Sequence, residues 1–224
     1  MTPLFWPCPQ PHDGASDEYA LAFDRGRALR LLVVPALFDE ANRLRRFCVE
    51  VMRRLDRAGV DAFLPDFPGT NESLRDLRDQ DAESWRAAMT AAADHFGATH
   101  VLGLRGGCLF TPAELPAWHY APVKGGNILR SMLRARMLAG KEAGREESRE
   151  VLTEMAHRDG ISLAGYPLAP ALFRDLEALA PDPAIPVIAQ EQIGGSGLWL
   201  RAEPDEDAAQ ADALAALLIE GMHA

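Results

Sequence analysis

The stretch Thr99-His100-Val101-Leu102-Gly103-Leu104-Arg105-Gly106-Gly107 decides the fold of this chain. An apolar run typical of a buried strand leads into a turn that is flanked by Gly103 and Gly107. In strand-to-helix turns of the Gly-x-Ser-x-Gly type, the glycines let the chain reverse tightly and lift the serine nucleophile above the sheet. Here the central residue is Arg105, whose guanidinium stays protonated and cannot attack a carbonyl. The stretch therefore predicts a nucleophile turn without its nucleophile.

Composition excludes several classes of function. The 224 residues are 48% hydrophobic and 25% charged, as in ordinary globular proteins, and carry a formal net charge of -10. That charge argues against a nucleic-acid binder, and no apolar run approaches the length of about 20 residues that a membrane-spanning helix needs. The N-terminus lacks the pattern of a signal peptide, so we expect a cytoplasmic protein. Three scattered cysteines indicate neither disulfides nor a metal site, and no cofactor is predicted.

Hydrophobic periodicity predicts alternating strands and helices. Short apolar runs indicate strands, and apolar residues spaced three or four apart indicate amphipathic helices. The expected strands are 31–34, 60–64, 100–104, 118–122, 161–166, 185–190 and 198–202, and the expected helices are 40–58, 82–95, 170–179 and 205–221. This alternation predicts an α/β fold with a doubly wound, mostly parallel sheet.

Two further segments complete the predicted organisation. We expect residues 1–29 to form an N-terminal extension and residues 30–224 to form a single domain. Within that domain, the charged segment 127–158 predicts a pair of helices inserted as a cap over the edge of the sheet. Residues 194–197, Gly-Gly-Ser-Gly, lack the following Lys-Ser/Thr of a phosphate-binding loop and are interpreted as a hairpin turn.

These features resemble the α/β hydrolases. The order of elements, the turn at 103–107 and the turn Asp66-Phe67-Pro68-Gly69-Thr70-Asn71-Glu72-Ser73 carry this resemblance. More narrowly, residues 35–46 (PALFDEANRLRR), Gly103-Leu104-Arg105 and Ala164-Gly165-Tyr166 resemble the second of the two hydrolase-like proteins encoded with bacterial exosortase A systems. The resemblance implies an α/β-hydrolase-like fold and a place beside exopolysaccharide production and protein sorting.

The catalytic machinery of a hydrolase is missing from the sequence. A Ser-Asp-His triad needs its histidine in a loop after the last strand, yet the only later histidine is His223, one residue from the C-terminus. Pro112 and Pro116 also shorten the helix that should follow the turn. The sequence therefore favours a non-catalytic accessory or binding protein.

Arg105 has two interpretations. In the structural one, its guanidinium binds carbonyl or carboxylate groups around the turn, with Glu40 or Asp39 as candidate partners. In the functional one, Arg105 and the amides of Gly106 and Gly107 hold a small anionic ligand, either a carboxylate or a phosphate. Buried arginines usually find partners within the protein, which favours the structural interpretation.

Three alternatives stay open at this stage. Cys108, with His119 as its base, is the candidate for a divergent hydrolase or acyl transferase, although a small buried side chain is the simpler role for Cys108. Glu40 and Asn42 lie where a hydrolase builds part of its oxyanion hole, and they either cap the following helix or bind a ligand. The inserted residues 127–158 offer a surface for a protein partner.

Overall fold

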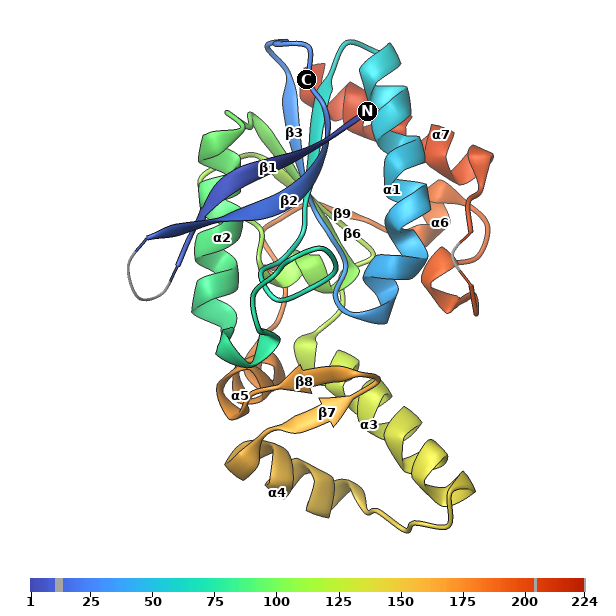
Figure 1. Cartoon of the computed structure of the whole chain (residues 1–224). Coiled ribbons are helices and arrows are strands. Elements are labelled where there is room, and N and C mark those ends of the chain that lie inside the picture. The colour runs from blue at the N-terminus through green and yellow to red at the C-terminus, as the bar shows by residue number, and fades with distance from the viewer. Residues whose placement is uncertain (11–13, 204, 224) are drawn as a thin grey trace.

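The fold is built on a seven-stranded, mostly parallel sheet, seen in a computed structural model that describes residues 1–10, 14–203 and 205–223 (Figure 1). The strands are β1 (Thr2–Pro9), β2 (Ala15–Phe23), β3 (Arg30–Val34), β4 (Asp61–Pro65), β5 (His100–Leu104), β6 (Ala117–Tyr120) and β9 (Val187–Ile188). Their order is β1-β2-β4-β3-β5-β6-β9; β2 pairs antiparallel with both β1 and β4, and the strands from β4 to β9 pair in parallel. The predicted parallel sheet is confirmed, with β5 flanked by β3 and β6.

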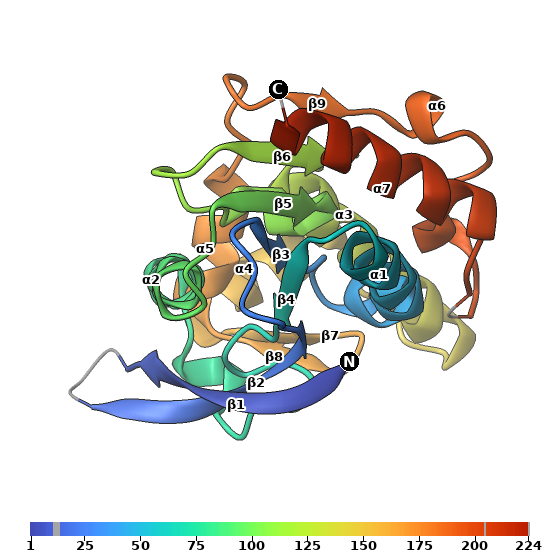
Figure 2. The same cartoon turned by 90° about the horizontal axis from the view of Figure 1, so that it is seen from above.

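Helices cover both faces of this sheet (Figure 2). The helices α1 (Asp39–Arg57) and α7 (Ala208–His223) pack on one face beside the short α6 (Gln190–Ile193), and α2 (Ala82–His95) and α5 (Pro170–Ala178) belong to the core of the other face. The side chains of β3 alternate between the two cores, with Leu31 and Val33 in one and Leu32 and Val34 in the other. This burial on both faces explains why the strand is apolar throughout.

Residues 1–29, for which we predicted only an extension, supply two strands of the sheet. β2 pairs with β4, and β1 forms the outer edge, while residues 11–13 lie outside the described structure. Trp6 and Cys8 of β1 are buried, so this hairpin adds to the core. Three prolines in β1 hid the strand from sequence analysis, because proline disfavours central strands and is tolerated at edges. Prolines also remove donors from the free edge, which discourages pairing with other chains.

A small cap lies at the carboxyl ends of the parallel strands (Figure 1). It consists of α3 (Gly125–Glu142), α4 (Arg149–Asp159) and a hairpin of β7 (Ile161–Leu163) and β8 (Tyr166–Leu168). α3 contacts η2 (Arg105–Leu109), the turn that follows β5. The predicted helix pair is present, but the single strand 161–166 is wrong. Ala164 and Gly165 both have positive φ (49° and 86°), as in a tight two-residue hairpin turn, so the chain reverses there.

Two predictions near the C-terminus are wrong. Residues 198–202 form the short 3-10 helix η3 (Leu198–Leu200) in place of a strand, and residues 194–197 connect α6 to η3 in place of turning a hairpin. Gly194 and Gly195 have positive φ (82° and 67°), which turns the chain away from an extended path. α7 also begins at Ala208, where Asp207 accepts a hydrogen bond from the backbone N–H of Gln210 (3.1 Å) and so caps the helix.

A cluster of arginines and aspartates holds the amino ends of the strands together. Arg25 and Arg27 each donate a hydrogen bond to Asp56 of α1 at 2.8 Å. Arg27 and Arg30 also bind the fully buried Asp61 of β4, at 3.2 and 3.0 Å. Burial alone would raise the pKa of Asp56, but the hydrogen bonds and charges of Arg25 and Arg27 outweigh it and lower the pKa below its ordinary value.

We expect this cluster to contribute to acid unfolding. Because the pKa of Asp56 is lower in the folded state, its stabilisation is fully present above the unfolded pKa of about 3.9 and is lost as the pH falls through the folded value. Asp56→Asn should therefore lower the urea midpoint at pH 7, and its difference from the wild type should shrink by pH 2.5. Asp17→Asn, at an exposed position, is the control and should follow the wild type at both pH values. An undiminished difference at pH 2.5 would contradict this assignment.

Candidate functional site

The turn after β5 keeps the backbone geometry of a nucleophile elbow. Arg105 lies directly after the strand at φ 53°, in the left-handed region that residues other than glycine rarely adopt. Such strain is typical of functional turns, and in α/β hydrolases it exposes the nucleophile above the sheet. Here the strained position presents a guanidinium, and the helix that should follow is reduced to η2.

The two glycines of the turn are required because a Cβ atom would clash there, and not because the backbone needs a positive φ. A Cβ at Gly107 would lie 2.2 Å from the backbone oxygen of Pro35, and one at Gly103 would lie 2.7 Å from Cγ2 of Thr111. Neither glycine is among the residues with positive φ. The prediction that the flexible backbone of these glycines lets the chain reverse is therefore wrong, because the residue with the unusual φ is Arg105 itself.

The guanidinium of Arg105 is bound by groups of the protein. Its Nε and Nη2 donate to the two carboxylate oxygens of Glu40, both at 3.0 Å, and its Nη1 donates to the backbone oxygen of Ala121 at 2.9 Å. The carbon at its centre lies 4.1 Å from the ring centroid of Trp199, so the indole covers one face of the cation. The Arg105 side chain is 15% exposed and that of Glu40 is 25% exposed. A bidentate, partly buried ion pair of this kind positions both side chains firmly.

The first turn of α1 supplies the carboxylate. The helix begins at Asp39 with Phe38 as its N-cap, and no side chain caps it. Glu40 interacts favourably with the positive end of the helix dipole while it binds Arg105. Asn42 is exposed, and within the described structure its side chain forms no hydrogen bond. The alternative that Glu40 and Asn42 cap the helix is therefore wrong, and only Glu40 joins Arg105.

Gly106 and Gly107 are buried under other parts of the chain. A Cβ at Gly106 would lie 2.8 Å from side-chain carbons of both Leu37 and Ile128, and Gly107 lies against the end of β3. Gly106 is therefore packed against apolar side chains, and Gly107 against the backbone at the end of β3.

Cys108 and His119 are not arranged as a nucleophile and its base. Sγ of Cys108 lies 4.0 Å from the backbone oxygen of Tyr120, and burial raises the pKa of this thiol far above its ordinary value. Nε2 of His119 pairs instead with Oγ1 of Thr111 at 3.0 Å, and burial lowers the pKa of the imidazole. A catalytic cysteine needs a lowered pKa, so the two shifts leave a neutral thiol and a neutral imidazole with separate partners.

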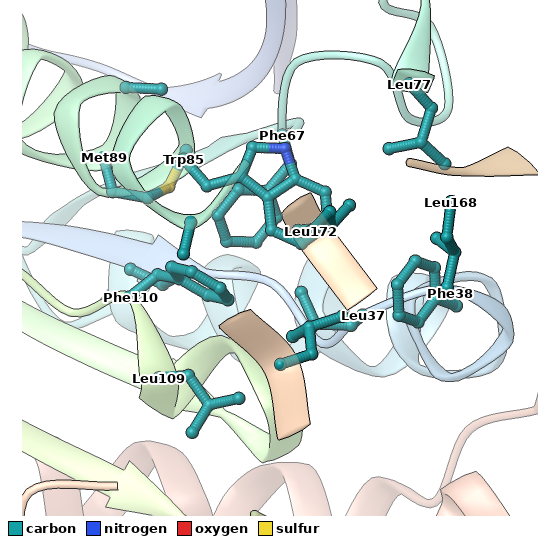
Figure 3. Packing of buried hydrophobic residues seen from close by; sticks show 14 of the residues in the cluster. Leu37, Phe38, Phe67, Leu77, Trp85, Met89, Leu109, Phe110, Leu168 and Leu172 are labelled. Carbon is teal, nitrogen blue, oxygen red and sulfur yellow. The ribbon is translucent and has the colours of Figure 1, made fainter. Parts of the chain in front are cut away.

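The space in front of the elbow is filled by apolar side chains. Figure 3 shows Leu37 and Phe38, from the loop after β3, among side chains that include Leu109 of η2 and Leu168 of the cap. The ring of Phe38 also lies 5.1 Å from that of Tyr166. One hollow lined by Leu37, Phe38 and Tyr166, among other residues, has a volume of about 10 Å³. It holds at most about one water molecule, far less than the roughly 300–1,000 Å³ of a ligand pocket.

Sequence analysis missed Trp199 and the carbonyl of Ala121. Trp199 belongs to η3, in the connection where a hydrolase carries its histidine, and the large aromatic residue there was the available signal. Ala121, directly after β6, has a positive φ of 46°, for which its residue type gives no hint. Groups of three or more metal-binding side chains are absent from the described part of the chain, where no helix is long and apolar enough to span a membrane.

Comparisons with known proteins place the fold among the α/β hydrolases. No family model and no curated protein sequence matches the chain. Among solved structures, it is similar to the mouse α/β hydrolase domain-containing protein 10, with a TM-score of 0.61 and 11% identity over 100% of this chain and 99% of that one. Est1E from Butyrivibrio proteoclasticus has a TM-score of 0.54 and 12% identity over 98% of this chain and 97% of that one. A thermophilic esterase from Thermogutta terrifontis has a TM-score of 0.53 and 13% identity over 100% of this chain and 97% of that one. The chain thus has an α/β-hydrolase-like fold.

Proposed function

We propose that this protein is a non-catalytic member of the hydrolase-like fold that works as an accessory or binding protein. The observation that carries the proposal is Arg105 at the nucleophile position. Its guanidinium binds both carboxylate oxygens of Glu40 and is covered by the ring of Trp199. An arginine cannot form a covalent acyl intermediate, and its pairing with Glu40 leaves no free cation to stabilise an oxyanion.

Two further features support the absence of catalysis. The thiol of Cys108 is buried and protonated at neutral pH, which disfavours the alternative of a divergent hydrolase or acyl transferase. The hollow beside the elbow is too small for a substrate. The ion pair of Arg105 with Glu40 favours the structural interpretation of Arg105 over an external carboxylate or phosphate ligand, since Glu40 occupies the position of the anion.

We further propose that the protein acts in the cytoplasm, within an exosortase A-type system of exopolysaccharide production. The support is the resemblance of residues 35–46, 103–105 and 164–166 to the hydrolase-like proteins of those systems. Deletion of the gene in the encoding bacterium should reduce secreted exopolysaccharide, and a copy carrying Arg105→Lys, which preserves the charge, should restore at least part of it. Unchanged exopolysaccharide in the deletion strain would refute this assignment.

The absence of catalysis is tested with p-nitrophenyl acetate and p-nitrophenyl butyrate. We expect the wild type to hydrolyse neither ester above the rate of a bovine serum albumin control. Arg105→Ser should stay equally inactive, because in the described residues His100, His119 and His157 hydrogen-bond to other side chains and none pairs with the elbow. Hydrolysis that Cys108→Ala abolishes would overturn the proposal in favour of cysteine catalysis. Hydrolysis that Cys108→Ala leaves intact would overturn it in favour of another site.

A further inference from the structure

The outer side of the cap carries an open groove that is separate from the elbow. The groove lies between the second half of α3 and the connection to α4, and its volume is about 690 Å³. We call it the cap groove; its lining residues are Arg134, Met137, Leu138, Lys141, Arg145, Glu146, Glu147 and Ser148. A second hollow of about 580 Å³, on the other side of α3, shares Arg145 and Glu147 with it.

The charges of the cap groove are predominantly positive. Glu147 is neutralised by Arg136, whose Nη2 and Nε donate to its two oxygens at 2.8 and 3.3 Å. Arg134, Lys141 and Arg145 form no salt bridge within residues 1–10, 14–203 and 205–223, and they outnumber Glu146, the other acidic residue of the groove. These cations stand out in a chain whose formal net charge is -10. A surface with an excess of one sign of charge attracts a partner of the opposite sign.

Apolar side chains lie between these cations. Leu138 is 60% exposed and is one of the few large exposed hydrophobic residues, and Met137 beside it is half-buried. Arg134, Leu138 and Lys141 are spaced four and three residues apart, so they share one face of α3. A binding surface with an apolar centre and a cationic rim fits a partner with apolar residues flanked by carboxylates.

We propose that the cap groove binds an acidic amphipathic helix of a partner protein. The stretch of α3 from Arg134 to Lys141 is about 10 Å long at 1.5 Å per residue, close to the diameter of a helix with its side chains. A helix laid across α3 places leucine-like side chains on Met137 and Leu138 and its Glu or Asp residues near Arg134, Lys141 and Arg145. This is the helix-in-groove mode of recognition.

Charge disfavours two other occupants. A second copy of this chain in a two-fold contact places one cationic groove against another, which like-charge repulsion opposes. An anionic membrane repels the strongly acidic remainder of the molecule. The proposal does not depend on the absence of catalysis, because the groove and the elbow share no residue.

The test is photo-crosslinking in the encoding bacterium with p-benzoylphenylalanine in place of Leu138. We expect an adduct whose crosslinked peptide, identified by mass spectrometry, lies in a Glu- or Asp-rich amphipathic helix. The same photo-crosslinker at Thr90, exposed on α2, should give no such adduct. Adding Arg134→Glu and Lys141→Glu should reduce the adduct at least tenfold, whereas the charge-matched control Arg57→Glu with Arg86→Glu should leave it unchanged.

A synthetic peptide tests the same interaction with the purified protein. The mapped segment, labelled with fluorescein, should bind the wild-type protein in a fluorescence anisotropy titration, with an affinity that falls as salt is raised and at least tenfold in the double charge reversal. A crosslink to a second copy, to lipid, or to a basic or non-helical segment would overturn the proposal. So would a correctly folded Leu138 variant that forms no adduct, or binding that the charge reversal leaves unchanged.

Discussion

Arg105→Ala is expected to lower the free energy of unfolding by about 2–4 kcal/mol. The substitution leaves the carboxylate of Glu40 and the carbonyl of Ala121 without their donors. Loss of one partner from a fully buried ion pair costs about 3–5 kcal/mol, and the 15% and 25% exposure of this pair lets water recover part of that energy. In a chain of this size the melting temperature should fall by about 5–15 °C, measured by calorimetry or circular dichroism.

A double-mutant cycle assigns this loss to the ion pair. Arg105→Ala combined with Glu40→Ala should cost about 1–3 kcal/mol less than the sum of the single variants, because the second substitution removes the unpaired carboxylate. Arg105→Gly should be more stable than Arg105→Ala by about 1 kcal/mol, since glycine adopts the φ of 53° without strain. Additive losses would show that the two side chains act independently.

The same variants test the anion-binding interpretation. If Arg105 holds an external anion, inorganic phosphate should raise the melting temperature of the wild type beyond the effect of sodium chloride at equal ionic strength, and Arg105→Ala should abolish that increase. We expect no such increase, because Glu40 already binds the guanidinium. A phosphate-specific increase that disappears in Arg105→Ala would refute the structural interpretation.

Local sequence signals were sufficient for the central elements of the fold. The bounds of β5 and α2 agree with the predicted 100–104 and 82–95. An unbroken apolar run specifies the strand, and Asp81 and Ser84 form a capping box that fixes the start of the helix. The strand β1 was missed because its buried Trp6 and Cys8 stand among prolines, which mask the alternation.

The candidate site required tertiary information. That an arginine occupies the nucleophile position follows from spacing, and Glu40 was one of two acidic partners considered for it. The stacking of Trp199 on Arg105 depends on a connection far along the chain that was expected to be a strand. Burial decides the state of Cys108, since the raised pKa of its thiol arises from packing that no local pattern reveals. The filled cleft likewise depends on how the cap closes on Leu37 and Phe38.

Gly107→Ala is expected to lower the free energy of unfolding by at least about 3 kcal/mol, at or beyond the upper end of ordinary overpacking. The new Cβ would lie 2.2 Å from the backbone oxygen of Pro35 and 2.6 Å from that of Val34, neither of which can rotate away as a side chain can. To relieve this clash, the elbow of the variant must move away from the end of β3. Because Val34 of β3 pairs with Gly103 of β5, this movement should strain the pairing of these two strands in the variant.

Gly126→Ala is the matched control for this elbow substitution. Gly126 lies in the first turn of α3 without a positive φ, and its new Cβ would meet the oxygen of Glu177 at 3.3 Å. Alanine favours a helix by up to about 1 kcal/mol over glycine, which offsets this tight contact, so the urea midpoint should stay close to that of the wild type. A Gly107→Ala variant as stable as this control would contradict the prediction. It would show that the close approach of η2 to β3 does not contribute to stability, and the pairing of Arg105 with Glu40 would then be the contact that holds the elbow.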